Sequence, residues 1–211
     1  MKQIILAALA AMALAACGGG GGGSGTTAPA PPPAPVTPPP VSQLAGYVGA
    51  WVSACDGREL NSVTVTRASG SADAIVISYK SDYYANLNCT GNVVATWTQS
   101  ADATAVYAGS VDASIVFTPG TNATAARVDK VTATLPAHTE SVVGSNVTHT
   151  VRNGQAMWCI DFGGGSSSCI YDQGAQPAQT VAGGLYMRGN ELFELSPSGS
   201  TYVVNERFTR K

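Results

Sequence analysis

The chain has 211 residues, and its 11 Lys and Arg residues against 13 Asp and Glu residues give a formal net charge of −2. Charged residues make up 11% of the sequence, less than half of the roughly 25% that is usual in soluble globular chains. This balance leaves no basic patch dense enough to bind a nucleic-acid backbone, and the length fits one domain or two small ones.

Residues 1–16 have the pattern of an export signal. Lys2 supplies the positive charge near the N-terminus, and an uncharged, apolar run follows over residues 4–12. A helix that crosses a bilayer needs about 20 apolar residues, so this run is too short to serve as a membrane span. We therefore expect residues 1–16 to form a signal peptide that is removed on export.

The signal ends in Leu14, Ala15, Ala16 and Cys17, a leucine and two small residues before a cysteine. This pattern resembles the lipobox of bacterial lipoproteins, in which the cysteine thiol receives a diacylglyceryl group and the chain is cut before it. The resemblance implies that Cys17 becomes the acylated first residue of the mature protein, with fatty chains of the palmitate type as its membrane anchor. It also implies the cell envelope, and Gly18 favours the outer membrane, because enteric inner-membrane lipoproteins carry an aspartate there. The alternative is an ordinary secreted protein with an incidental cysteine.

Residues 17–42 form a low-complexity spacer that begins at this cysteine. Glycines with one serine fill positions 18–25, and residues 28–41 carry 8 of the chain's 12 prolines. Flexible glycine and extended polyproline segments of these lengths reach on the order of 50 Å together. Because this composition buries too little apolar surface to fold, we expect a disordered tether that holds a folded domain away from a membrane. A PxxP ligand for a recognition module is the alternative.

The remaining residues, 43–211, are expected to form one domain of β-strands. Runs rich in Val, Ile, Thr and aromatic residues alternate apolar and polar positions, at 62–66, 74–79, 93–97, 114–117 and 131–135. No window has a long helical period, and only residues 101–108 suggest a weak helical turn. We predict an all-β fold, an antiparallel meander of about eight to ten strands that closes into a barrel or packs as a sandwich.

Two hairpins can be aligned from the sequence alone. The Asn-Gly pair at 153–154 is the preferred dipeptide of two-residue type I′ turns, and centring the turn there places His149 opposite Trp158. One face of this hairpin is mostly apolar, so a shift of one residue would expose it to solvent. The Gly-Asn pair at 189–190 predicts a second tight hairpin, and the last strand is expected at 202–208.

The domain has an even number of cysteines, namely Cys55, Cys89, Cys159 and Cys169. In an exported chain this number indicates two disulfides, and four cysteines allow three connectivities. If Cys159 is placed opposite Cys169 on the next strand, the apolar face of the hairpin stays apolar across three strands. We therefore favour Cys159–Cys169 together with Cys55–Cys89. A zinc site is the competing interpretation, and the lack of a CxxC pair argues against it.

The start of the domain has a Gly-x-Trp pattern, with Gly49 and Trp51 on an expected first strand. This resembles the opening of the lipocalin and wider calycin families, in which the tryptophan closes one end of an up-and-down barrel. The resemblance implies a basic residue near the last strand that lies across the tryptophan, either Arg207 or Arg210. The second lipocalin motif, an Asp-Tyr pair late in the barrel, is out of place, because residues 82–83 come too early in the chain.

A nearer similarity is to small β-rich proteobacterial lipoproteins that have no assigned function. It rests on residues 49–51, on Cys55 and on the Cys-Thr-Gly sequence at 89–91. This resemblance implies a β-rich lipoprotein domain and no particular chemistry.

The chemistry-bearing residues form no recognisable catalytic motif. His138 and His149 lack the spacing of a metal site, the carboxylates are scattered singly, and no Gly-x-Ser-x-Gly element is present. We expect His149 to be a buried or half-buried histidine with one hydrogen bond. We predict no catalytic residue, no metal and no cofactor. The residues expected to fill the barrel, or to line a ligand cavity within it, are Trp51, Tyr79, Trp97, Phe117, His149 and Trp158.

Together these features predict a lipid-anchored protein of the cell envelope that is displayed on a tether and is not an enzyme. Its domain is expected to bind a partner protein or a small apolar ligand, or to serve a structural role. A filled barrel with an exposed apolar patch would favour a protein partner, and a deep apolar pocket would favour a ligand. The alternative is a periplasmic or surface hydrolase that uses an Asp or His side chain.

Overall fold

The computed structural model describes residues 42–211, so the predicted signal peptide, the acylated Cys17 and almost all of the predicted tether lie outside the described residues. The described part consists mainly of strands, which confirms the all-β prediction, with two short 3₁₀ turns, η1 (Ala45–Tyr47) and η2 (Leu87–Cys89). The strands are, in chain order, β1 (Gly49–Ser53), β2 (Glu59–Arg67), β3 (Ala74–Asn86), β4 (Thr90–Gln99), β5 (Ala103–Val116), β6 (Thr124–Leu135), β7 (His138–Val143), β8 (Val147–Arg152), β9 (Gln155–Gly163), β10 (Ser166–Tyr171), β11 (Ala175–Gln176), β12 (Gln179–Arg188), β13 (Glu191–Ser198) and β14 (Thr201–Arg210).

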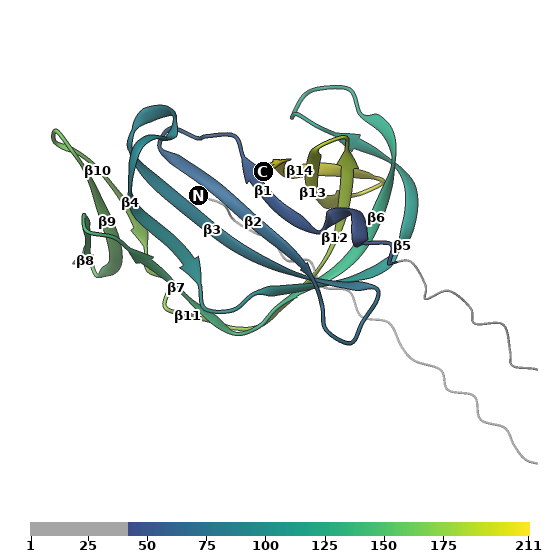
Figure 1. Ribbon diagram of the computed structural model, residues 1–211, viewed down its shortest axis with the longest axis horizontal. Helices are drawn as coiled ribbons and strands as arrows, with labels where there is room; N and C mark the ends of the chain where they lie inside the picture. The colour runs from purple at the N-terminus through teal and green to yellow at the C-terminus, as the bar shows by residue number, and fades with distance from the viewer. Residues whose placement is uncertain (1–41) are drawn as a thin grey trace, which may run out of the picture. The chain divides into compact units, whose positions relative to one another are not determined.

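Eight of these strands close into a barrel (Figure 1). The hydrogen-bonded order runs β3-β2-β1-β14-β13-β12-β6-β5, and β5 then pairs with β3 again. All neighbours in this ring are antiparallel, and the start of β14 makes an additional, short parallel contact with the end of β5. The predicted antiparallel meander is therefore confirmed, and its closure removes the free sheet edges around the ring.

Three of the barrel strands are continued outside the ring by further strands, β4, β7 and β11, here termed the extension. β5 pairs with the first part of β3, and β4 pairs with the rest of β3. In the same way β7 extends β6 alongside β4, and β11 extends β12 alongside β7. The described residues thus hold fourteen strands and not eight to ten. Breaks at 100–102, 136–137 and 177–178 each divide a long strand in two, and without them the number would be eleven, still one above the predicted range. The helical turn expected at 101–108 is wrong, because pairing with β3 and β6 draws most of these residues into β5.

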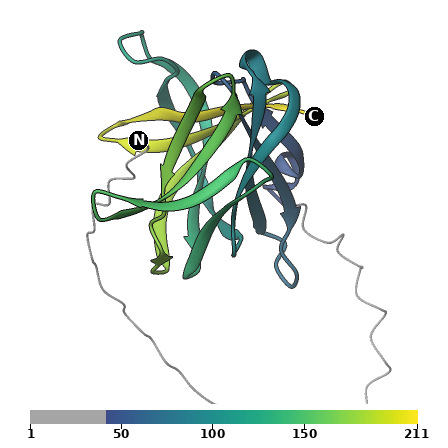
Figure 2. The same ribbon diagram turned by 90° about the vertical axis from the view of Figure 1, so that its left-hand side faces the viewer.

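A second sheet of three strands, in the order β10-β9-β8, packs against this extension. Its green strands lie nearest the viewer in Figure 2. The predicted register is confirmed, with His149 opposite Trp158. The turn at 153–154 has φ values of 51° and 79°, which an Asn-Gly sequence accepts at little cost. The hairpin at 189–190 also has the predicted register, between β12 and β13.

Buried side chains of the described residues gather in three clusters. The barrel cluster surrounds Trp51 and Phe208, both of which are fully buried. A second cluster joins β5 and β6 to the β13–β14 hairpin around Ile115 and Phe193. The third lies between the β4–β7 extension and the three-stranded sheet, around Ile160. The domain thus combines a barrel with a small two-layered region beside it.

Candidate functional site

Trp51 and Arg210 lie together at one end of the barrel. The indole N–H donates a hydrogen bond of 2.8 Å to the carbonyl oxygen of Tyr47. The Arg210 guanidinium lies over the indole, 4.4 Å from the ring centroid, and donates to the carbonyl oxygens of Gly46 (2.9 Å) and Val48 (3.3 Å). Of the two basic residues expected across this tryptophan, Arg210 therefore takes the position. A cation over an indole face is favourable, so this contact stabilises the junction of β1 and β14.

Gly49 provides the space for this contact. Its φ is 150°, and a Cβ atom at this position would lie 3.0 Å from Arg210 Nη1. Glycine therefore allows the guanidinium to reach the backbone carbonyls before β1. The Gly-x-Trp pattern therefore reflects a packing arrangement at this end of the barrel. The other candidate, Arg207, lies elsewhere, in an ion pair with Glu191.

A polar network within the barrel is centred on Asp129. The Tyr47 hydroxyl donates to Asp129 Oδ2 (2.7 Å), and the Ser110 hydroxyl donates to Asp129 Oδ1 (2.7 Å). The Tyr107 hydroxyl lies 2.7 Å from Ser110 Oγ. Burial, followed by the hydrogen bond to Asp129, raises the pKa of Tyr47 well above its ordinary value. These side chains satisfy one another, as buried polar groups must if the fold is to be stable.

A second polar group includes two glutamates that the sequence analysis did not single out. Glu194 on β13 lies directly opposite Glu206 on β14. Leu192 and Phe208, two positions away on the same strands, belong to the barrel cluster. Because side chains on a strand alternate between faces, both glutamates lie on the inner side of the barrel. The sequence signal for these glutamates was their spacing of two residues from Leu192 and Phe208. That signal could be interpreted only once the pairing of β13 with β14 was known.

Neutral donors from β2 and β3 meet these carboxylates. The Tyr79 hydroxyl donates to Glu194, and the Asn61 side-chain amide donates to Glu206 Oε1 at 2.6 Å. The Ser81 hydroxyl donates to Asn61 Oδ1 at 2.6 Å. Burial and the two neighbouring carboxylates raise the pKa of Tyr79 well above its ordinary value. The arrangement holds two acidic groups and neutral hydrogen-bond donors, with no His or Cys beside them in these contacts.

The aromatic residues predicted to fill or line one cavity are distributed over the three clusters. Trp51 and Tyr79 belong to the barrel cluster. Phe117 packs in the second cluster, and Trp97 and Trp158 pack in the third. They do not share a cavity, because β4 and β9 lie outside the ring.

The two histidines occupy unrelated places. His149 is more exposed than expected, with 44% of its side chain accessible, because β8 is an edge strand that is covered on one side only. Its ring lies 4.1 Å from Trp158, centroid to centroid, and its Nε2 makes the single expected hydrogen bond, 2.8 Å to Asp172 Oδ2. His138 is buried, with its Nδ1 3.0 Å from the carbonyl oxygen of Pro136. Neither histidine is hydrogen-bonded to a serine or cysteine within residues 42–211.

Both predicted disulfides are confirmed. Cys55 is joined to Cys89, and Cys159 is joined to Cys169, with S–S distances of 2.03 and 2.02 Å. The first bond ties the loop after β1 to η2, and the second links directly opposed positions of β9 and β10. The cysteines of the described domain are therefore structural cross-links.

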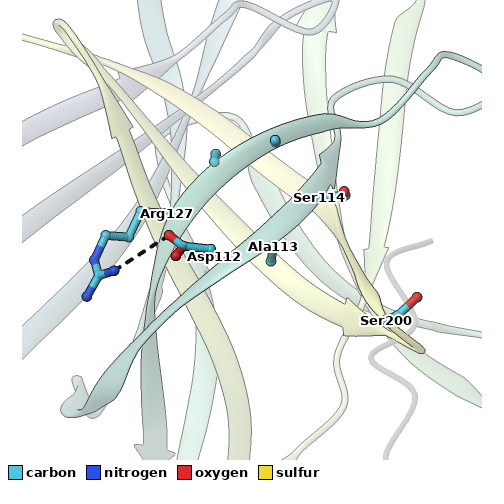
Figure 3. Close-up of a pocket in the computed structure, with 7 residues that line it drawn as sticks. Asp112, Ala113, Ser114, Arg127 and Ser200 are labelled. Atoms are coloured by element: carbon cyan, nitrogen blue, oxygen red, sulfur yellow. Dashed lines mark ion pairs between the residues drawn. The ribbon is translucent and has the colours of Figure 1, made fainter.

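Two shallow hollows lie on the outer surface. The first is lined by residues of β5 and β6 together with Ser200, and it contains an ion pair between Asp112 and Arg127 at 3.5 Å (Figure 3). These side chains are 86% and 67% exposed, so their attraction is weakened by solvent. The second hollow lies on the three-stranded sheet beside Cys159. Neither hollow has the buried, convergent polar groups that are typical of a ligand pocket.

Residues 42–211 contain no cluster of three or more His, Cys, Asp or Glu side chains arranged to hold a metal ion. No helix in this part of the chain has the length and apolar character needed to cross a bilayer. Comparison of the chain with protein-family models, with curated proteins and with solved structures gives no match.

Proposed function

We propose that this protein is a lipid-anchored lipoprotein of the cell envelope, whose β domain acts as a non-enzymatic binding or structural module. The anchor is supported by the lipobox-like pattern at residues 14–17 and by the glycine- and proline-rich segment that follows it. Acyl chains on Cys17 would hold the protein stably on a membrane if two or more are attached. Gly18 favours the outer membrane as the place of attachment.

The filled interior of the barrel is the observation that best supports a binding role on the outer surface of the domain. A barrel of about eight strands has room for its own side chains or for one small ligand. Here Trp51, Phe208 and ten other buried side chains form the barrel cluster, and Arg210 lies over the indole at one end. These side chains take up the space that a ligand would need. A protein partner on the outer surface is therefore favoured over a small apolar ligand inside the barrel.

The exposed apolar residues indicate where such a partner would bind. Five of the seven large hydrophobic side chains that are exposed in the described residues lie on the extension, on the three-stranded sheet or in η2, which joins β3 to β4. They are Leu87, Val93, Val143, Val151 and Tyr171. Exposed apolar side chains that gather in one region are typical of protein contact sites. We therefore place the binding surface at this end of the domain and not on the barrel.

Native mass spectrometry of the protein extracted from its own host tests this role. We expect a complex with a different protein, and we expect it to be lost in a Leu87→Asp, Val143→Asp double variant. Val106→Asp is the matched control, because Val106 is also exposed (46%) but lies on the barrel strand β5. A stoichiometric small apolar molecule in place of a protein would support ligand binding instead, and would contradict a protein-binding role.

A further inference from the structure

Strand β8 forms an outer edge of the three-stranded sheet. Within residues 42–211 its ladder partner is β9 alone, and it lies on the left-hand side of the domain in Figure 1. The two-residue turn makes Arg152 and Gln155 a hydrogen-bonded pair, and such pairs alternate with non-bonded ones along the ladder. The backbone N–H and C=O groups of His149 and Val151 therefore point away from β9, as does the Val147 carbonyl, whereas the Val147 N–H donates to the Gly144 carbonyl oxygen at 3.4 Å. A further strand could pair with this row of groups.

Proline, lysine and a bulge, which protect many edge strands, are absent from β8, although it is only six residues long and ends in Arg152. Edges are usually blocked by proline, by lysine, by a bulge or by a covering segment. β11 is followed directly by Pro177, and β10 has a register irregularity between Ser166 and Ser167. β8 pairs with β9 without any irregularity, and Val151 is 66% exposed. Of these three edge strands, β8 is thus the one best suited to accept another strand.

The sequence of β8 is complementary to itself. Residues 147–151 read Val-Thr-His-Thr-Val, which is the same in both directions. In an antiparallel pairing centred on His149, Val147 lies opposite Val151 of the second copy, and Thr148 lies opposite Thr150 of the second copy. Pairs of β-branched residues and of threonines are favourable cross-strand neighbours. The pairing also joins the outward backbone groups of the two strands.

Charges at the ends of this pairing are complementary as well. Arg152 lies opposite Asn146 of the second copy. Within that second copy, Asp161 on β9, the next strand inward, donates its backbone N–H to the Asn146 carbonyl oxygen (2.9 Å). Arg152 and Asp161 are both exposed and lie on the same face of the combined sheet. Two strand spacings separate them, about 10 Å, which an extended arginine and an aspartate can bridge together. The two-fold symmetry would form this ion pair twice.

We propose that β8 is a homodimerisation edge, through which two copies of this chain join their three-stranded sheets into one continuous antiparallel sheet. The two-fold contact uses each edge once, so it ends at a dimer. The pairing of one short strand falls below the roughly 1,200 Å² of a stable interface, so the dimer is weak in dilute solution. Any arrangement that concentrates copies on a surface strengthens it. The contact itself does not depend on the lipid anchor or on a heterologous partner.

Sedimentation velocity of the full chain in detergent, over a wide range of protein concentration, tests this dimer. The wild-type protein should pass from monomer to dimer as its concentration rises. Val151→Lys should weaken dimerisation at least tenfold, because it places a charge on the edge, whereas Ser167→Lys on β10 should leave it unchanged. A wild-type protein that stays monomeric up to its solubility limit, or equal dimerisation of Val151→Lys, would overturn the proposal.

A cysteine cross-link tests the register independently, and it decides the matter if Val151→Lys does not fold. The pairing places the two copies of position 149 opposite each other as a hydrogen-bonded pair, with Cα atoms about 5.5 Å apart. This separation lies within the range of a disulfide. Mild oxidation of His149→Cys should therefore give a covalent dimer, and Ser167→Cys should not. Absence of that dimer at concentrations where the wild-type protein associates would contradict the proposed register.

Discussion

Glu194 and Glu206 lie directly opposite each other on the inner face of the barrel, and each accepts a hydrogen bond from a neutral side chain of a facing strand. Like charges in directly opposed positions of a sheet repel each other. Tyr79 and Asn61 therefore stabilise this part of the barrel through their hydrogen bonds as well as through their packing. Polar partnerships therefore contribute to the interior of the domain beside its apolar packing.

Tyr79→Phe should lower the free energy of unfolding by roughly 1–3 kcal/mol at neutral pH, because it removes a donor from a carboxylate and leaves the packing nearly unchanged. Urea denaturation measures this loss. Tyr171→Phe is the matched control, because Tyr171 is 47% exposed and its change should cost little. Equal stability of the two variants would mean that the Tyr79 hydrogen bond contributes nothing to the fold.

Three tyrosines with raised pKa values, two in the barrel cluster and one in the third cluster, also predict a loss of stability at alkaline pH. Burial is the largest cause that raises the pKa values of Tyr47, Tyr79 and Tyr83 above the ordinary 10.0, and neighbouring carboxylates add to it. Above about pH 10 the unfolded chain loses these protons and the folded chain keeps them, so unfolding becomes more favourable as pH rises. Each tyrosine contributes up to about 1.4 kcal/mol per pH unit in that window, and its stabilisation is complete below it.

Urea denaturation at a series of pH values from about 8 to 11 checks this prediction. The free energy of unfolding should fall increasingly steeply above pH 10, and less steeply in Tyr79→Phe. A flat profile across that window would show that these hydroxyls ionise as readily in the folded protein as in the unfolded chain.

Two adjacent glycines of β12 offer a test of barrel packing. A Cβ atom at Gly184 would lie 2.6 Å from Val128 Cγ1 and 2.9 Å from Tyr202 Cε1, whereas one at Gly183 would approach no atom closer than 3.4 Å. Gly184→Ala should therefore destabilise the protein by about 1–3 kcal/mol through overpacking. Gly183→Ala is the control on the same strand and should have a smaller effect. Thermal unfolding measures both, and the reverse order would contradict this description of the second cluster.

Arg210→Ala should lower the stability of the domain by roughly 1–2 kcal/mol, because it removes a cation from the face of Trp51 and two hydrogen bonds to carbonyl oxygens. Arg210→Lys should recover only part of this loss, since an ammonium group lacks the planar fork of donors. Thermal unfolding with Arg127→Ala as the exposed control provides the comparison. A loss no larger than that of the control would mean that Arg210 does not stabilise the junction of β1 and β14.

The register of the hairpins could be predicted from the sequence because local turn chemistry determines it. The Asn-Gly turn at 153–154 specifies which residues of β8 and β9 face each other. The alignment of Cys159 with Cys169 was predicted from the continuity of the apolar face from β9 into β10. The contact of Arg210 with Trp51 was also anticipated, as one of two choices, from a resemblance at the two ends of the domain. These features depend on short spacings or on a recognisable motif.

Features that depend on pairing between distant strands could not be predicted. Nothing in the local sequence shows that β3 pairs with β5 along one part and with β4 along the rest. That division places Trp97 and Trp158 outside the barrel, although their sequences resemble those of barrel strands. The opposition of Glu194 and Glu206 likewise requires the register of β13 with β14, which no turn signal in the sequence analysis specified.

We propose that Cys17 carries the lipid that places the domain at the cell envelope. Intact mass spectrometry of the protein extracted from its host's membranes measures this modification. The chain should begin at Cys17 and be heavier by three acyl chains and a glyceryl group. A full-length chain that still begins at Met1, carries an unmodified thiol at position 17 and is recovered from the cytosol would contradict it.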